Sequence, residues 1–237
     1  MMVAILLICF VSIFLNIGIL TNSRVNIKEI MLWSVLIFSV LLVIITEITS
    51  AFHLLNFQFI QMSWVGISIL YIIFSFFKKK KLVDFATIIK HWVDNILSRL
   101  NKFEKTLFFS IIIILILVFI QGIVYPPHNI DSMTCYMARI INWISHKSVE
   151  HYPTNNYQQI YHSPFPQFLI MHINILSCGD YFSNSVQFFF LVFSLFAIVS
   201  IVELFGLSRQ YKLIAFVLAV TIPEVICKPP ANSILPI

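Results

Sequence analysis

The residues best suited to chemistry lie close together, in a polar segment from Tyr125 to His162 that separates long apolar stretches. Within it, Asp131 could act as a general base, and the forked donors of Arg139 could hold a phosphate group. A carboxylate and a guanidinium at a lipid–water boundary suit the transfer of a sugar from a lipid-linked phosphate to a hydroxyl group. Further candidates for binding such a substrate are His128, Tyr136, Lys147 and His162, together with His146 and His151.

These polar residues can also have purely structural roles. Asp131 follows two prolines and stands where the N-cap of a helix belongs, and Arg139 could anchor the chain to lipid head groups. Cys135 and Cys178 could form a disulfide outside the cytoplasm or stay unpaired. The histidines and cysteines lack the spacing of a zinc site, and no nucleotide-binding glycine motif is visible, so the sequence indicates no metal and no other cofactor.

The composition is that of a membrane protein. The chain has 237 residues, of which 59% are hydrophobic and 11% are charged, and its mean hydropathy is +0.94. The apolar runs are continuous, whereas the strands of a transmembrane β-barrel alternate apolar and polar residues. We therefore expect an all-α, polytopic transmembrane fold. The net charge of +5 reflects basic residues just outside the apolar runs and does not indicate nucleic-acid binding.

Six apolar stretches are expected to cross the bilayer, since a span takes about 20 mostly apolar residues. They are Met1–Leu20, Ile30–Thr49, Met62–Phe77, Thr106–Val124, Asn184–Phe205 and Leu213–Ile226. Glu47 and Glu203 stand near the ends of spans, where a carboxylate could be functional or could simply meet water.

The run of lysines from Lys78 to Lys81 orients the chain, because cytoplasmic loops collect basic residues. Residues 1–81 then form an N-terminal segment of three spans. Residues 82–105 follow as an amphipathic helix on the cytoplasmic lipid surface, where the helix could dock a partner or merely connect two spans. Residues 106–237 form a second membrane segment.

The apolar stretch Phe165–Cys178 has about 14 residues and contains polar side chains, which makes it short for a span. If it does not cross the membrane, Arg209 and Lys212 face the cytoplasm, as basic residues usually do. Residues 125–183 are therefore expected to form one long region on the non-cytoplasmic side of the cell membrane.

Residues 131–146 are expected to form an amphipathic helix at the membrane surface. Its apolar stripe consists of Met133, Tyr136, Met137, Ile140, Ile141 and Ile144. The opposite, polar stripe consists of Ser132, Cys135, Arg139, Asn142 and His146, and is expected to face water or protein.

Several stretches of this region resemble the integral-membrane glycosyltransferases of the GT-C superfamily. The nearest group is the RgtA/B/C/D-like branch, which is related to protein mannosyltransferases and to lipid A sugar transferases. The stretches that carry the resemblance are Asn129–Trp143, Ser148–Thr154, Ser163–Phe168 and Gly179–Gln187. It extends from about Thr106 to Val225.

The resemblance implies a role for particular residues. In the family, an external loop carries an essential acidic residue just after a span, and this residue corresponds to Asp131. Pro164 and Pro166 match a segment that helps to form the donor pocket. Many relatives have a second acidic residue beside the first, where this chain has Ser132. Members of the family are also longer, and residues 227–237 do not resemble them, so we expect a truncated chain or an N-terminal fragment, whose activity could be lost.

The function that the resemblance implies is transfer of a sugar from a polyprenyl-phosphate donor to a lipid or glycan acceptor on the outer face of the cytoplasmic membrane. Its partners would be the lipid-linked sugar donor and membrane lipids. The alternative is a non-catalytic membrane subunit of envelope polysaccharide assembly. A secondary transporter agrees less well with the sequence, because transporters place polar groups within their spans.

Overall fold

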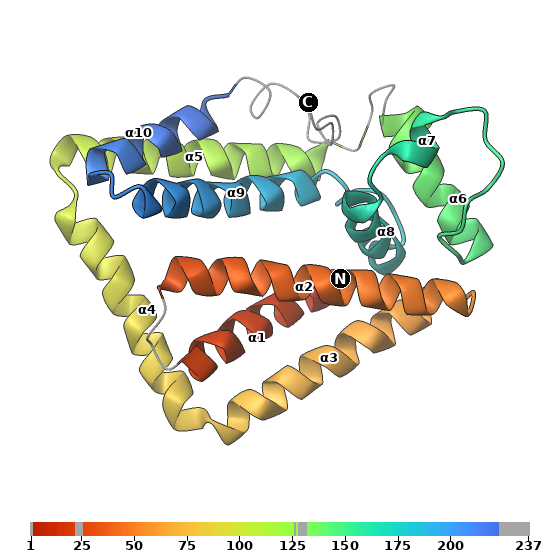
Figure 1. Cartoon of the computed structure of the whole chain (residues 1–237), viewed down its shortest axis with the longest axis horizontal. Coiled ribbons are helices and arrows are strands. Elements are labelled where there is room, and N and C mark those ends of the chain that lie inside the picture. The colour runs from red at the N-terminus through yellow and green to blue at the C-terminus, as the bar shows by residue number, and fades with distance from the viewer. Residues whose placement is uncertain (1, 22–25, 126, 128–131, 223–237) are drawn as a thin grey trace.

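The computed structural model describes residues 2–21, 26–125, 127 and 132–222, and all secondary structure in this part of the chain is helical (Figure 1). The helices are α1 (Ala4–Thr21), α2 (Ile27–Ala51), α3 (Phe57–Phe77), α4 (Lys79–Arg99), α5 (Lys102–Val124), the π-helix η1 (Ser132–Met137), α6 (Ala138–His146), α7 (Gln158–Tyr161), α8 (Phe165–Ser177), α9 (Ser185–Leu204) and α10 (Arg209–Val220). Five of them, α1, α2, α3, α5 and α9, are long and apolar enough to cross a membrane. The prediction of an all-α fold is confirmed, and these five helices match five of the predicted spans to within five residues at either end.

The sixth predicted span, Leu213–Ile226, stays a prediction. It corresponds to α10, which has 12 residues and ends at Val220, and residues 223–226 lie outside the described part of the chain. The short apolar stretch that was predicted not to cross forms α8, with 13 residues. In Figure 1, α5 ends and α9 begins at the same end of the bundle.

Side-chain caps set the boundaries that the apolar pattern missed. The side chain of Asn56 accepts a hydrogen bond of 3.1 Å from the N–H of Phe59, and α3 therefore begins five residues before the predicted start. Asn101 forms a capping box with Glu104, whose Oε2 accepts from the Asn101 N–H at 2.8 Å. The single helix predicted over residues 82–105 is therefore two: α4 ends at Arg99 and α5 begins at Lys102.

The spans form two groups that lie side by side (Figure 1). Helices α1, α2 and α3 form one group, α5, α9 and α10 form the other, and α4 connects the two at one end of the bundle. We name this end, formed by α4 and the span ends beside it, the α4 end. The opposite end carries η1, α6, α7 and α8, and we name it the α8 end.

Ion pairs join the two groups at the α4 end. Glu203, in the last turn of α9, pairs with Lys28 of α2 and with Lys212 of α10, the second at 2.7 Å. Arg209 of α10 pairs with Glu104 of α5. Glu203 therefore has a structural role: its carboxylate links α9 to a helix of the other group.

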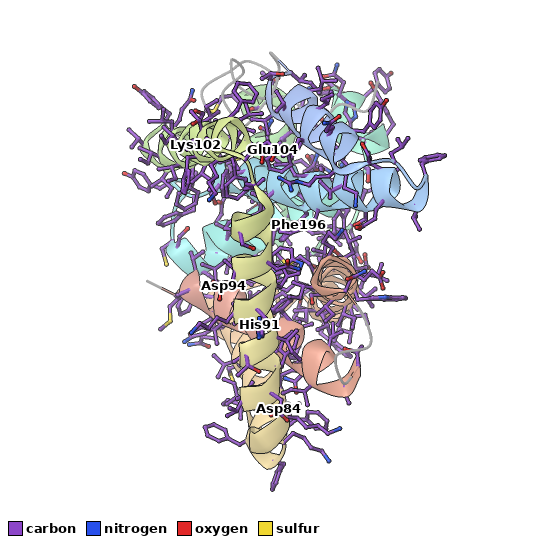
Figure 2. All side chains as sticks on the ribbon, turned by 90° about the vertical axis from the view of Figure 1, so that its left-hand side faces the viewer. Asp84, His91, Asp94, Lys102, Glu104 and Phe196 are labelled. Atoms are coloured by element: carbon purple, nitrogen blue, oxygen red, sulfur yellow. The ribbon has the colours of Figure 1, made fainter. Side chains whose placement is uncertain are left out.

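Helix α4 crosses the ends of the spans instead of running beside them (Figure 2). Phe85 is its anchor, because the ring is buried and packs 5.7 Å from the ring of Phe14. The Phe85 ring also fills the space beside Gly18 of α1, where an added Cβ would stand only 2.2 Å from Cζ of the ring. A glycine at position 18 thus lets α4 dock on the end of α1.

The main apolar core lies between the first group of spans and the helices of the α8 end. Trp64 of α3 and Leu42 of α2 belong to it, as do Trp143 of α6 and Met171 of α8. Helix α8 is therefore held against α2 and α3, and α6 packs on α8, which gives the polar residues on these helices fixed positions.

Candidate functional site

The predicted site residues lie at the α8 end, where the described chain resumes at Ser132. Arg139, Tyr136 and His162 belong to this end, on α6, η1 and the segment after α7. Asp131 and His128 lie outside the described residues. The described part of the site consists of residues that follow Asp131 in the sequence.

The helix expected over residues 131–146 begins as the π-helix η1 and continues as α6. A π-helix places more residues in each turn than an α-helix does, so the stripes expected from α-helical spacing are displaced. Of the apolar stripe, Met133 is 55% exposed and Ile141 is 63% exposed, whereas Met137 and Ile140 are buried. Of the polar stripe, Ser132, Cys135 and Arg139 are buried. The polar stripe was expected to face water or protein, and these three residues face protein.

The protein that covers this face is the segment after α6, which is fastened to η1 by amide side chains. Gln159 donates from Nε2 to the carbonyl of Thr134 at 2.7 Å, and its Oε1 accepts from Tyr152 Oη at 2.7 Å. Cys135 donates from Sγ to Gln158 Oε1, also at 2.7 Å. Burial raises the pKa of Tyr152, which keeps the phenol neutral and able to donate. The sulfur of Cys135 is thus engaged within the loop.

Arg139 is the only lysine or arginine that is buried among the side chains that the structure describes, with an exposed fraction of 5%. Its Nη1 donates to the carbonyl of His162 at 2.9 Å, and its Cζ lies 4.5 Å from the centre of the Trp143 ring. The ring offers a cation–π contact, and Phe168 of α8 packs on it at 5.4 Å. Burial lowers the pKa of the guanidinium, but an arginine side chain stays protonated in a protein.

This surrounding leaves the charge of Arg139 unbalanced within the described part of the chain. The three ion pairs there all lie at the α4 end and do not include Arg139. One of its five N–H donors is used by His162, and the aromatic ring supplies no full negative charge. Burying an arginine without an anion is costly. Such a group is suited to receive an anionic ligand.

The other predicted substrate-binding residues divide into two sets. His162 lies with its ring 5.9 Å from that of Tyr136, close to Arg139 through its own carbonyl. Lys147 is exposed and ends α6 with a φ of 55°, about 12 Å along the helix axis from Arg139 at 1.5 Å per residue. The structure therefore brings Arg139, Tyr136 and His162 together and leaves Lys147 apart.

His172 of α8 is a buried polar residue whose role the sequence did not reveal. Trp64 donates from Nε1 to His172 Nδ1 at 2.9 Å, so Nε2 carries the proton and donates to Thr46 Oγ1 at 3.0 Å. Thr46 in turn donates to the carbonyl of Leu42 at 2.8 Å. Burial lowers the pKa of His172 to about 3, so the imidazole stays neutral. We name these three side chains the His172 network; it fixes α8 to α2 and α3.

No group of three or more histidine, cysteine or carboxylate side chains able to hold a metal occurs among the described residues. His172 uses both ring nitrogens within its network, and this use excludes it as a ligand. Comparisons of the chain with models of protein families, with curated proteins and with solved structures gave no match.

Proposed function

We propose that the chain is a membrane glycosyltransferase of the GT-C type, which takes a sugar from a polyprenyl-phosphate donor and transfers it to a lipid or glycan hydroxyl at the outer face of the cytoplasmic membrane. The observation that carries the proposal is the buried guanidinium of Arg139 at the α8 end, which has no anionic partner among the described residues. The donor's phosphate would supply such an anion. Arginine binds phosphate with paired, charge-assisted hydrogen bonds, which fix the orientation of the group as well as its position.

The roles divide between two residues eight positions apart in the sequence. Asp131 accepts the proton of the attacking hydroxyl group, as a general base. Arg139 binds the phosphate and stabilises the charge that develops on it when the bond to the sugar breaks. The carbonyl of His162 accepts from the guanidinium, and the His162 ring lies 5.9 Å from the buried ring of Tyr136. The half-buried ring of His162 is the one that we expect to contact the sugar.

The membrane part of the molecule offers a place for the donor's hydrocarbon chain. A cavity of about 240 Å³ lies between α5, α9 and α10, with Val118, Leu191 and Leu195 in its wall. Gln187, in the first turn of α9, also lines it, so the cavity extends to the α8 end. An isoprenoid chain in this cavity would carry its phosphate toward the same end of the bundle as Arg139.

The test is an assay with membranes that contain the chain and labelled polyprenyl-phosphate hexoses or pentoses. Wild-type protein is expected to move label into a glycolipid or glycan, and Asp131→Asn is expected to abolish this transfer while polyprenyl phosphate still binds. Arg139→Lys keeps the charge without the forked donors and should lower the rate about 100-fold. Lys147→Gln, a change at the end of the same helix but outside the site, should leave transfer unchanged.

A second candidate, the non-catalytic subunit of polysaccharide assembly, predicts a different pattern. The protein would then bind lipid-linked sugar without moving label from any donor, and Asp131→Asn would change nothing. Full transfer by the Asp131→Asn variant would contradict the assignment of that residue as the base.

A further inference from the structure

The basic charge of the molecule is concentrated in one segment. Residues 78–105 contain eight lysines and arginines and three aspartates and glutamates, a net charge of +5. The remaining residues hold seven basic and seven acidic side chains, and so balance to zero. The segment of α4 and its flanks therefore carries the whole net charge of the chain.

Among the described residues, internal partners do not neutralise this charge. Lys78, Lys81, Lys90, Lys102 and Lys105 are all exposed, and none of them forms an ion pair with a described residue. Of the three carboxylates in the segment, Glu104 is already paired with Arg209 of α10. Only Asp84 and Asp94, both exposed on α4, remain to oppose the lysines, and Figure 2 shows them on separate turns of the helix.

Exposed aromatic side chains flank the same helix. Phe77, just before α4, is 83% exposed, and Phe103, just after it, is 78% exposed. Helix α4 itself crosses the ends of the spans, as a helix that lies in a membrane surface does (Figure 2). Its buried anchor Phe85 turns one side toward α1 and leaves the lysines outside. An interfacial lipid site has two parts: apolar rings, which enter the acyl region, and lysines beside them, which contact the lipid head groups.

We propose that α4 and its flanking lysines, residues 78–105, form a binding surface for anionic phospholipid in the leaflet at the α4 end. The phosphodiester groups of several lipids contact the lysines at the two ends of the helix, while Phe77 and Phe103 insert among the acyl chains. Electrostatic attraction of this kind grows with each basic residue near the surface and is screened by salt. The inference concerns the opposite end of the molecule from Arg139 and is independent of the glycosyltransferase proposal.

The experiment uses the full chain in nanodiscs that contain phosphatidylcholine alone or an equal mixture with phosphatidylglycerol, with enrichment of labelled phosphatidylglycerol around the protein as the readout. Wild-type protein is expected to enrich the anionic lipid, and 0.5 M NaCl should remove most of the enrichment. The variant with Lys78, Lys79, Lys80 and Lys81 changed to glutamine should bind at least tenfold more weakly. Asp94→Asn, which makes α4 more positive, should bind at least as tightly as wild type.

Two control measurements complete the experiment. Lys147→Gln removes a lysine at the α8 end and should not alter the enrichment, and inorganic phosphate at millimolar concentration should not compete with lipid in a membrane. Unchanged enrichment in the quadruple variant would overturn the proposal, and so would equal enrichment of phosphatidylcholine. Competition by inorganic phosphate would instead indicate a site for a soluble anion and would contradict a lipid surface.

Discussion

The two ends of the helical bundle hold their polar residues in opposite ways. At the α4 end the charges are exposed or paired with one another, as Glu203 is with Lys28 and Lys212. Among the residues that the structure describes at the α8 end, the buried polar groups are neutral except for Arg139. An exposed charge keeps most of its hydration, so its free-energy cost is small and its interactions depend on salt and on lipid. A buried polar group loses its hydration and needs a hydrogen-bond partner within the protein. The comparison separates an end built to meet a surface from an end built to hold defined groups in place.

The largest expected effect on stability is that of removing His172 at the α8 end, compared with removing His91 at the α4 end. His172→Ala leaves the Trp64 N–H and the Thr46 hydroxyl without their partner and opens a cavity, so it should destabilise the protein by about 3–5 kcal/mol. His91→Ala changes an exposed residue of α4 and should cost less than about 0.5 kcal/mol. Thermal unfolding of both variants in detergent measures the difference. Equal losses would contradict the contrast between the two ends.

Acid should act on the same network. The pKa of His172 is held at about 3 in the native state, whereas an unfolded histidine has a pKa of about 6.5. The contribution of His172 to stability is therefore complete above pH 6.5. It falls by about 1.4 kcal/mol per pH unit as the pH drops from 6.5 toward 3, because only the unfolded chain binds the proton. Wild-type protein should lose about 2 kcal/mol between pH 6.5 and pH 5, and His172→Gln should lose less over the same range. Parallel unfolding curves for the two proteins at both pH values would contradict the buried neutral imidazole.

Substitutions at Gly18 test how α4 packs against α1. Gly18→Ala places a Cβ against the Phe85 ring and should destabilise the protein by about 1–2 kcal/mol, although alanine is the better helix former. In a Phe85→Ala background the space is free, and the same substitution should then stabilise by up to about 1 kcal/mol. Gly66→Ala is the matched control, because nothing lies within 4 Å of its added Cβ. A destabilisation by Gly18→Ala that persists without Phe85 would show that the ring is not the obstacle.

The smallest expected effect belongs to the exposed ion pairs. Glu203→Gln removes the partner of Lys28 and Lys212 and should cost about 0.5–1 kcal/mol at low salt, since Glu203 is partly exposed. The loss should shrink at 0.5 M NaCl, where screening is strong. His172→Ala should show no such dependence on salt. A Glu203→Gln effect of several kcal/mol, insensitive to salt, would mean that the α4 end is also held by buried groups.

The sequence predicted the membrane part of the fold because continuous apolar runs of span length are typical of helices that cross a bilayer. The lysine run and the short length of Phe165–Cys178 predicted that this stretch does not cross; it forms the 13-residue helix α8, and its place outside the membrane stays a prediction. The helix boundaries at Asn56 and Asn101 were missed, since they depend on single side-chain caps and not on the apolar pattern.

The candidate site was less accessible to sequence reasoning. Arg139 and Tyr136 could be selected from one helical segment, but the π-helix that alters their spacing has no periodic signal. The His172 network joins residues that are 108 and 126 positions apart, so only the fold brings them together. Asp131 lies outside the described residues and stays a prediction.

The central claim is that Arg139 holds the phosphate of a lipid-linked donor, and binding of labelled polyprenyl phosphate to the purified chain tests it most directly. Wild type and Lys147→Gln are expected to bind alike, Arg139→Lys about tenfold more weakly, and Arg139→Gln about 100-fold more weakly. Circular dichroism and size-exclusion chromatography confirm that each variant is folded. Equal binding by a folded Arg139→Gln variant would contradict the account.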